Sequence, residues 1–194
     1  MIGFLLSMVS IKLTFPPIII ATFLFLNSSY GYFMVEPHYN IFRGKIDDNK
    51  NENFFEGHTF GARIGYIGEN LLMGVNVVSG NFNFQNEFYE TKEDQFKGGG
   101  IGSFLGFHTQ HIKIWVGYLN STLEARQNAQ GRYFGQYVSY GIGVNLFSNL
   151  YLNNEYFQNY YTSYEDDETG KTEGLDKNIK TIGNYFSLSI LSYF

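Results

Sequence analysis

The feature that most constrains this chain is an alternation of bulky apolar side chains with small or polar ones, at a period of two residues. The alternation fills eight segments, at about residues 32–43, 57–67, 70–83, 99–108, 111–121, 131–146, 149–161 and 181–194. A period of two places successive side chains on opposite faces of a strand. Long segments with a helical period are lacking, so the pattern predicts an all-β fold of eight strands.

The connections between these segments alternate between long and short. The long ones span residues 44–56, 84–98, about 123–130 and 162–180, and the short ones centre on Gly68-Glu69, Thr109-Gln110 and Phe147-Ser148. Up-and-down barrels of outer membranes have short turns at the periplasmic end and longer loops outside. A soluble eight-stranded barrel such as a lipocalin shares the strand count, but it has no reason to place every long loop at one end.

The two faces of each segment separate these alternatives. In residues 131–146, Tyr140 and Ile142 share a bulky apolar face, whereas Gly141 and Gly143 lie on the other. The interior of an eight-stranded barrel has just enough room to be filled by side chains. We therefore expect an antiparallel up-and-down transmembrane β-barrel, with the glycine-rich polar faces inside and the apolar faces on lipid. Aromatic residues near strand ends are expected to form interfacial girdles: Phe33, Tyr66, Phe107, Tyr118, Tyr160 and Phe194.

The composition agrees with this partition. The chain has 20 Phe, 16 Tyr and 22 Gly, yet its mean hydropathy of −0.18 is that of a soluble protein. Acidic loops lower the mean hydropathy. The low value therefore excludes a helical membrane protein but does not exclude a β-barrel. The absence of cysteine excludes disulfides and thiolate metal sites, and the net charge of −5 argues against a nucleic-acid partner.

Residues 1–31 have the character of a cleaved secretory signal peptide. Their apolar core, at residues 15–26, follows a single lysine and precedes small residues at the expected cleavage site after Gly31. A membrane anchor is the alternative, but this core is shorter than the ~20 residues that a spanning helix needs. We predict a mature barrel of residues 32–194, and Met8 is an alternative start to the first methionine.

The last segment ends in Phe194, and Phe186, Leu188 and Ile190 lie on the same face of that strand. This arrangement resembles the membrane-insertion signal at the C-terminus of bacterial outer-membrane barrels, although Ser192 stands third from the end, where that signal usually has an aromatic or apolar residue.

In its pattern, the region 32–194 resembles the small eight-stranded outer-membrane barrels typified by OmpX, the OmpA membrane domain and OmpW. The resemblance implies a location in the outer membrane of a Gram-negative cell. It also implies contact with outer-membrane lipids and lipopolysaccharide, insertion by the barrel-insertion machinery, and a monomeric state.

Ionisable residues on the inward faces form a candidate lumen charge network. They lie at similar depth when counted from the short turns: Glu36, His38, Arg63, Lys113 and Glu155. Because unpaired buried charge is costly, we expect these groups to pair. A salt-bridged plug is the structural interpretation, and a gate or polar conduit is the functional one.

We therefore predict a structural or surface-interaction role, with acidic extracellular loops and a narrow lumen closed by paired charges. A narrow pore or transporter for small or hydrophobic solutes is the alternative. A third hypothesis is a lipid-A-modifying enzyme, because some barrels of this size act on lipid A.

The residues offer little support for the enzyme hypothesis. The deacylase type uses a His-x-Ser pair with a nearby Glu, and none of the four histidines is followed by Ser two residues on. His58 with Thr59 and Glu56 is the one candidate expected at the outer rim. We predict no enzymatic activity, no catalytic residues, no cofactor and no metal site.

The last long connection contains an acidic run that is a candidate cation-binding loop: Glu165, Asp166, Asp167 and Glu168. Carboxylates bind divalent cations, which also bridge anionic lipopolysaccharide. The run lacks the spacing of a calcium loop, and a solvated loop tip is the alternative interpretation.

Overall fold

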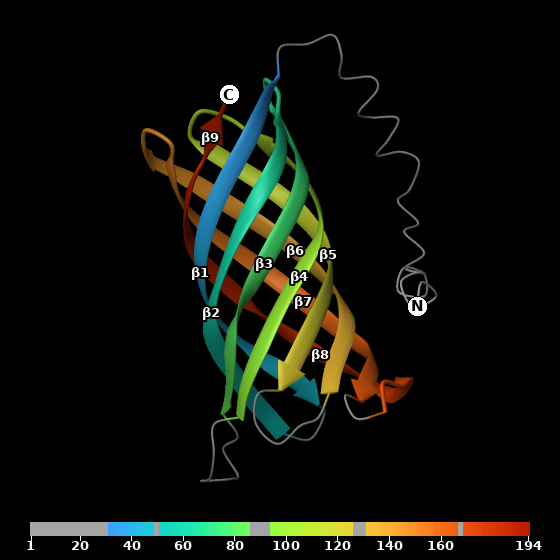
Figure 1. Ribbon diagram of the computed structural model, residues 1–194. Coiled ribbons are helices and arrows are strands. Elements are labelled where there is room, and N and C mark those ends of the chain that lie inside the picture. Colours follow the sequence, from blue (N-terminus) through green and yellow to red (C-terminus); the bar gives the residue numbers. More distant parts are fainter. Residues whose placement is uncertain (1–30, 49–50, 86–93, 126–130, 167–168) are drawn as a thin grey trace, which may run out of the picture. The chain divides into compact units, whose positions relative to one another are not determined.

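The computed structural model describes residues 31–48, 51–85, 94–125, 131–166 and 169–194 (Figure 1). The predicted signal peptide therefore lies, except for Gly31, outside the described residues. No helix in the described ranges is long and apolar enough to cross a membrane.

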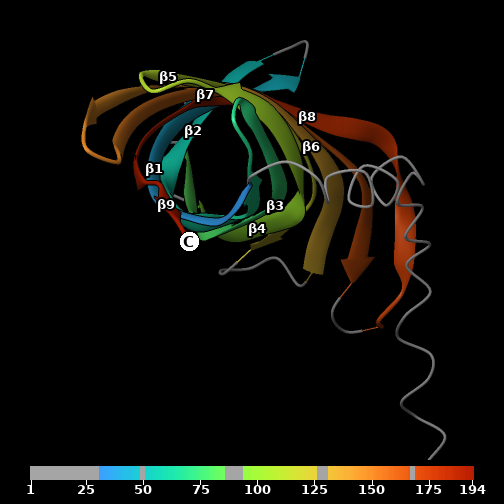
Figure 2. The same cartoon turned by 90° about the horizontal axis from the view of Figure 1, so that it is seen from above.

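Long antiparallel strands follow one another around a closed barrel. Their bounds are β1 Tyr32–Asp48, β2 Asn51–Ile67, β3 Leu71–Gln85, β4 Asp94–His108, β5 Ile112–Ala125, β6 Gly131–Phe147, β7 Leu150–Asp166 and β8 Thr172–Ile190, with a short β9 at Ser192–Tyr193. Each long strand pairs with the next, and β1 pairs with both β2 and β8, which closes the ring (Figure 2). The predicted eight-stranded up-and-down barrel is confirmed.

The short β9 continues β8 along the same partner strand. His38 pairs with Ser189 of β8, and Met34 pairs with Tyr193 of β9 in the same register. Beyond that pair, Phe33 and Phe194 exchange two backbone hydrogen bonds, of 3.2 and 3.0 Å. The C-terminal residue therefore completes the barrel at the end where the short turns lie, which we call the turn end. The opposite end is the loop end.

The strands extend further toward the loop end than predicted. β1 and β2 pair as far as Asp48 and Asn51, inside the segment 44–56 that was expected to be a loop. β8 likewise begins at Thr172 and not near residue 181. Asn, Asp and Gly mark loops in most sequences, but here the partner strand of each hairpin satisfies their backbone groups, so the polar segments remain extended.

The outer face carries a belt of exposed apolar side chains, as predicted. Its members lie on each of the eight long strands and are about half exposed, among them Ile41, Phe60, Ile64, Val75, Val77, Ile101, Leu105, Ile114, Val116, Ile142, Val144, Leu152, Phe186, Leu188 and Ile190. Met73 is an exception, because it is 7% exposed although it shares the outward face of β3. It lies between Tyr66 and Leu105 of the neighbouring strands.

The interior differs from the prediction, because it contains large apolar side chains as well as glycines and charges. One apolar cluster lies at the turn end and consists of Met34, Ile67, Leu72, Phe104, Tyr151 and Leu191. A second, toward the loop end, is mainly aromatic and consists of Phe42, Phe55, Leu119, Tyr137, Phe157 and Tyr185. Glycine makes the room: a Cβ on Gly44 would lie 2.6 Å from the Phe55 ring.

Candidate functional site

Four charged side chains from four strands meet inside the barrel. Glu36 on β1, Arg63 on β2, Lys113 on β5 and Glu155 on β7 are each at most 6% exposed. Glu36 and Arg63 are direct partners across the β1–β2 pair, so alternation turns both side chains inward. The sequence-predicted charges thus come together in the structure, and we call these four residues the charge network.

Arg63 bridges the two carboxylates. Its Nη2 donates a hydrogen bond of 2.6 Å to Glu155 Oε2, and its Nη1 lies 3.5 Å from Glu36 Oε2. Lys113 Nζ donates to Glu36 Oε1, and the Ser189 hydroxyl donates to the same oxygen. Two cations and two carboxylates therefore neutralise one another, which is the arrangement that buried charge requires.

Three donors hold Glu155. Besides Arg63, Trp115 Nε1 donates to Oε2 at 3.1 Å and Tyr137 Oη donates to Oε1 at 2.9 Å. Trp115, Gly141 and Glu155 occupy one row of paired positions across β5, β6 and β7. The indole reaches Glu155 across Gly141, where a Cβ would overlap the Trp115 ring.

Aromatic rings also face both cations. The Arg63 guanidinium carbon lies 4.2 Å from the Trp115 ring centroid, and Lys113 Nζ lies 4.3 Å from that of Tyr151. Such cation–π contacts are worth more where water is excluded. These contacts add to the stabilisation that the two cations receive from the carboxylates.

His38, the fifth predicted member, lies beside the charge network and contacts side-chain amides. Its Nδ1 lies 3.1 Å from Asn40 Oδ1, and its Nε2 lies 3.2 Å from Asn76 Oδ1. Asn40 Nδ2 in turn donates to Thr59 Oγ1 at 2.7 Å. The amides give His38 neutral partners, so its hydrogen bonds do not require a carboxylate.

The charge network lies between the two apolar clusters along the strands. On β7, Tyr151 of the turn-end cluster precedes Glu155, and Phe157 of the aromatic cluster follows it on the same inward face. Tyr137 and Phe157 stack with ring centroids 5.6 Å apart and an interplanar angle of 17°. The lumen is thus built in three layers: apolar, charged and aromatic.

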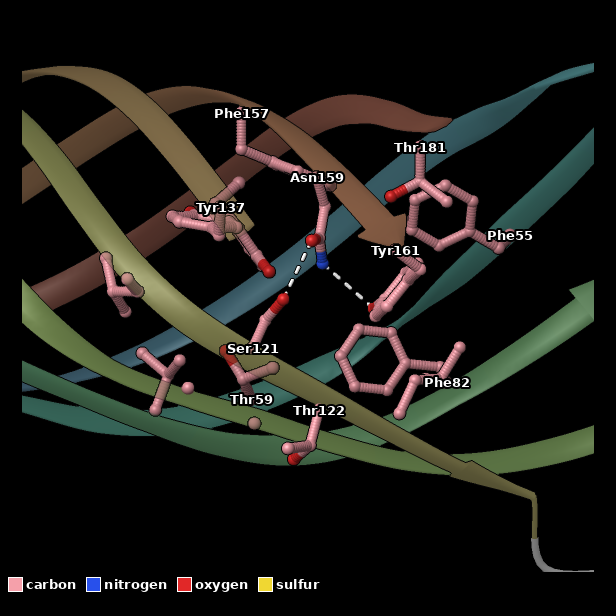
Figure 3. Close-up of a pocket in the computed structure, with 16 residues that line it drawn as sticks. Phe55, Thr59, Phe82, Ser121, Thr122, Tyr137, Phe157, Asn159, Tyr161 and Thr181 are labelled. Atoms are coloured by element: carbon pink, nitrogen blue, oxygen red, sulfur yellow. Dashed lines mark hydrogen bonds between the residues drawn. The ribbon is translucent and has the colours of Figure 1, made fainter. Parts of the chain in front are cut away.

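A small pocket lies on the loop side of the aromatic cluster (Figure 3). Its cavity volume is about 30 Å³, room for roughly two water molecules. Ser121 Oγ donates to Asn159 Oδ1 at 2.7 Å, and Asn159 Nδ2 donates to Tyr161 Oη at 2.9 Å, as Figure 3 shows. These wall residues satisfy one another and leave little space for a solute.

The three residues considered for catalysis do not share one face, since Glu56 and His58 are exposed on the outside and Thr59 is buried inside. Thr59 is 1% exposed and accepts a hydrogen bond from Asn40 inside the barrel, whereas His58 is exposed on the outer face beside Tyr39 and Phe60. Neighbouring residues of a strand point to opposite faces. His58 is therefore not placed to activate the Thr59 hydroxyl.

The candidate cation-binding loop is described in part. Asp167 and Glu168 lie outside the described residues. The Asp166 carboxylate accepts hydrogen bonds from the Thr169 backbone N–H, at 2.8 Å, and from its hydroxyl, at 3.1 Å. This carboxylate therefore stabilises a turn. Within the described ranges, no group of three or more His, Asp or Glu side chains is placed to hold a metal ion.

The residues of the predicted insertion signal share the outer face of the last strand. The exposed fractions of Phe186, Leu188, Ile190 and Phe194 are 61%, 51%, 54% and 79%. Tyr193, by contrast, pairs with Met34, whose side chain points into the barrel. Its ring packs against that of Tyr32 at the turn end, with ring centroids 5.8 Å apart.

Sequence reasoning missed Tyr137 and the aromatic cluster. Tyr137 lies on the inward face of β6 together with Gly135, Ser139 and Gly141. Strict counting of alternate positions would have placed it inside the barrel. The prediction placed bulky side chains outside, because the interior of an eight-stranded barrel is narrow. The structure shows that an inward glycine leaves room for a ring, as Gly44 does for Phe55.

Comparisons with known proteins identify the fold of the chain but no sequence family. No family model and no curated protein sequence matches the chain. Among solved structures, Neisserial surface protein A is similar over 81% of this chain and 96% of its own, at 13% identity and a TM-score of 0.53. Ail of Yersinia pestis, crystallised with the heparin analogue sucrose octasulfate, is similar over 84% and 97%, at 13% identity and a TM-score of 0.49.

The likeness to Neisserial surface protein A concerns the whole barrel, since it covers most of both chains. It agrees with the closed ring of antiparallel strands. An exposed apolar belt around such a ring matches the hydrocarbon core of a membrane. The chain therefore has the fold of the small eight-stranded outer-membrane β-barrels, and its belt places that fold in an outer membrane.

Proposed function

We propose that the chain is a monomeric outer-membrane barrel with a structural or surface-interaction role and a lumen closed to solutes. The observation that carries this proposal is the neutral charge network between two apolar clusters. A solute would have to separate Arg63 from Glu155 and displace the rings beyond them. Breaking a buried ion pair costs several kcal/mol, so passage through the resting barrel is unfavourable.

Planar-bilayer recording of the refolded full chain tests the closed lumen. We expect no resolvable conductance from the wild-type barrel. A steady conductance that Arg63→Ala or Glu155→Ala alters would contradict closure and favour the alternative, a narrow pore. One observation supports that alternative: Arg63 Nε, Ser139 Oγ and Asn153 Oδ1 are buried without a hydrogen-bond partner among the described residues. Water in the lumen would satisfy such groups.

Location and partners are tested separately. The chain should fractionate with outer membranes and migrate differently on gels with and without heating, as folded barrels do. Depletion of the barrel-insertion machinery should reduce its folded fraction. Recovery from the soluble periplasm would overturn the membrane assignment.

The proposed role requires neither catalysis nor a cofactor. The separation of His58 from Thr59 onto opposite faces supports this part of the proposal. Mass spectrometry of lipid A from cells with and without the protein should give identical spectra. A change in acylation that depends on His58 would instead indicate an enzyme.

A further inference from the structure

The side chains of Lys113 and Asn153 converge over Gly143 inside the barrel. These three residues occupy one row of paired positions on β5, β6 and β7, and all of them face the lumen. A Cβ on Gly143 would overlap Asn153 Oδ1 and would lie 2.6 Å from Lys113 Cε. Because β6 presents no side chain at this point, the lysine and the asparagine reach toward each other across that strand.

The hydrogen bonds of Ser189 fix the orientation of the Asn153 amide. The Ser189 hydroxyl donates its one proton to Glu36 Oε1, so toward other groups it is an acceptor. It accepts from Lys113 Nζ at 3.2 Å and from Asn153 Nδ2 at 2.9 Å. Asn153 Nδ2 also lies 3.5 Å from the Ser187 carbonyl oxygen. The amide nitrogen therefore faces β8, and the carbonyl oxygen is directed over β6, toward the lysine.

The carbonyl oxygen of Asn153 is buried and has no hydrogen-bond partner among the described residues. Asn159, the other buried asparagine of β7, differs in this respect, because its Oδ1 accepts from Ser121 at 2.7 Å. An unpaired buried acceptor is unfavourable. The Asn153 amide thus brings an electrophilic carbon, free of hydrogen bonds at its oxygen, to the side of a primary amine.

Glu36 is placed to move protons at this site. Its Oε1 accepts from Lys113 Nζ and from the Ser189 hydroxyl, and the same hydroxyl contacts Asn153 Nδ2. Glu36, Lys113 and Asn153 are each 1% exposed, and the Tyr151 ring covers Nζ with its centroid 4.3 Å away. A nucleophile, an electrophile and an acid–base group therefore meet where water has little access.

We propose that Lys113 and Asn153 form an intramolecular isopeptide bond once the barrel has folded. Glu36 takes one proton from the Lys113 ammonium, and the neutral Nζ attacks Asn153 Cγ. The bond between Cγ and Nδ2 breaks, and Nδ2 leaves as ammonia with a second Nζ proton, which Ser189 relays. The new amide keeps the third Nζ hydrogen, and Glu36 keeps the first proton as a neutral acid. The step needs no oxidant, reductant or cofactor.

The product leaves the lumen electrically neutral. The amide replaces the Lys113 cation and the protonated Glu36 carries no charge, so the ion pair of Arg63 with Glu155 remains. Two buried charges disappear, which is favourable where water is excluded. The bond joins β5 to β7 across β6 and so adds a covalent link inside the lumen. This inference goes beyond the proposed function and depends on the barrel fold alone.

Mass spectrometry of the full chain before and after refolding tests the bond. The chain recovered unfolded from inclusion bodies should have the mass of its sequence, and the refolded barrel should be lighter by one ammonia. Digestion of the heated barrel should give one branched peptide that contains both Lys113 and Asn153. Separate, unmodified peptides from a fully folded sample would overturn the proposal, and lumen water would then be the partner of the Asn153 carbonyl.

Matched variants locate the reaction. Lys113→Arg and Asn153→Ala remove the nucleophile and the electrophile, so each should keep its full sequence mass after refolding. Lys97→Arg and Asn159→Ala are the controls, because Lys97 is exposed on the outer face and the Asn159 carbonyl is hydrogen-bonded; both should lose ammonia as the wild type does. Glu36→Gln should slow the loss by about 100-fold, as expected when a positioned acid–base group is removed.

The heat-dependent gel shift reports the fold of every variant, so only folded samples are compared. Loss of ammonia from Lys113→Arg at the wild-type rate would indicate cyclisation of an asparagine and contradict the bond. A wild-type rate in Glu36→Gln would contradict the proton transfer. The proposed function fails by different measurements, since a conducting barrel or a soluble periplasmic protein would contradict it whatever the mass of the chain.

Discussion

Arg63 and Glu155 are 92 residues apart in the chain, yet a hydrogen bond of 2.6 Å joins them in the middle of the lumen. They lie on β2 and β7, which do not pair with each other. The contact therefore adds a link across the lumen that the backbone hydrogen bonds of the ring do not provide. Glu36 and Lys113 complete the network on the remaining side of Arg63.

Replacing Arg63 by Ala should lower the free energy of unfolding by about 3–5 kcal/mol, because one cation would remain for two buried carboxylates. Urea unfolding of the barrel in lipid vesicles, followed by the heat-dependent gel shift, measures this change. Arg132→Ala is the control, since Arg132 and Glu124 are an exposed pair, 48% and 46% accessible, for which about 0–1 kcal/mol is expected. Equal losses in the two variants would show that the lumen is well hydrated and the network weak.

The sequence predicts the charge network because strand alternation leaves few choices. Glu36, Arg63, Lys113 and Glu155 lie on inward faces at similar distances from the short turns, and unpaired charge in a narrow lumen is costly. The strand order follows in the same way from the alternation of short and long connections. Both predictions depend on alternation along the chain, of side chains within strands and of short with long connections. A single sequence shows both alternations directly.

Side-chain reach and hairpin length could not be predicted in this way. Tyr137 donates to Glu155, and glycines such as Gly44 and Gly183 make room for the rings of Phe55 and Phe157. Which side chains meet in this way depends on the register between strands. The hairpin of β1 and β2 continues to Asp48 because paired backbones hold polar residues extended. Composition alone predicts a loop for a segment rich in such residues.

Tyr137→Phe removes one of the three donors to Glu155 and leaves the aromatic cluster in place. We expect a loss of about 1.5–3 kcal/mol in the free energy of unfolding, the usual range for a buried hydrogen bond to a charged group. Tyr140→Phe is the control, because Tyr140 is 56% exposed on the same strand, and its change should be within about 0.5 kcal/mol. Urea titration of the two variants side by side gives the comparison. Indistinguishable curves would contradict a role for the Tyr137 hydroxyl.

Gly141→Ala tests whether glycine makes room for Trp115. The added methyl group would overlap the indole ring, so overpacking should destabilise the barrel by about 1–3 kcal/mol. The emission spectrum of Trp115, the single tryptophan of the chain, should shift as the ring moves. Gly174→Ala is the matched change, since nothing lies within 4 Å of a Cβ there. An unchanged spectrum and stability in Gly141→Ala would mean that Trp115 does not lie across β6.

Arginine placed on the outer face should report the depth of the membrane. Ile142 lies at the middle of the apolar positions of β6 and is 47% exposed, whereas Gln136 is exposed on the same face nearer the loop end. Ile142→Arg should cost about 2–4 kcal/mol in lipid vesicles, and Gln136→Arg about 0–1 kcal/mol, because the penalty for arginine decreases from the bilayer midplane to the interface. Reversible urea unfolding in vesicles measures both values. Similar penalties at the two positions would mean that the belt does not lie across the hydrocarbon core.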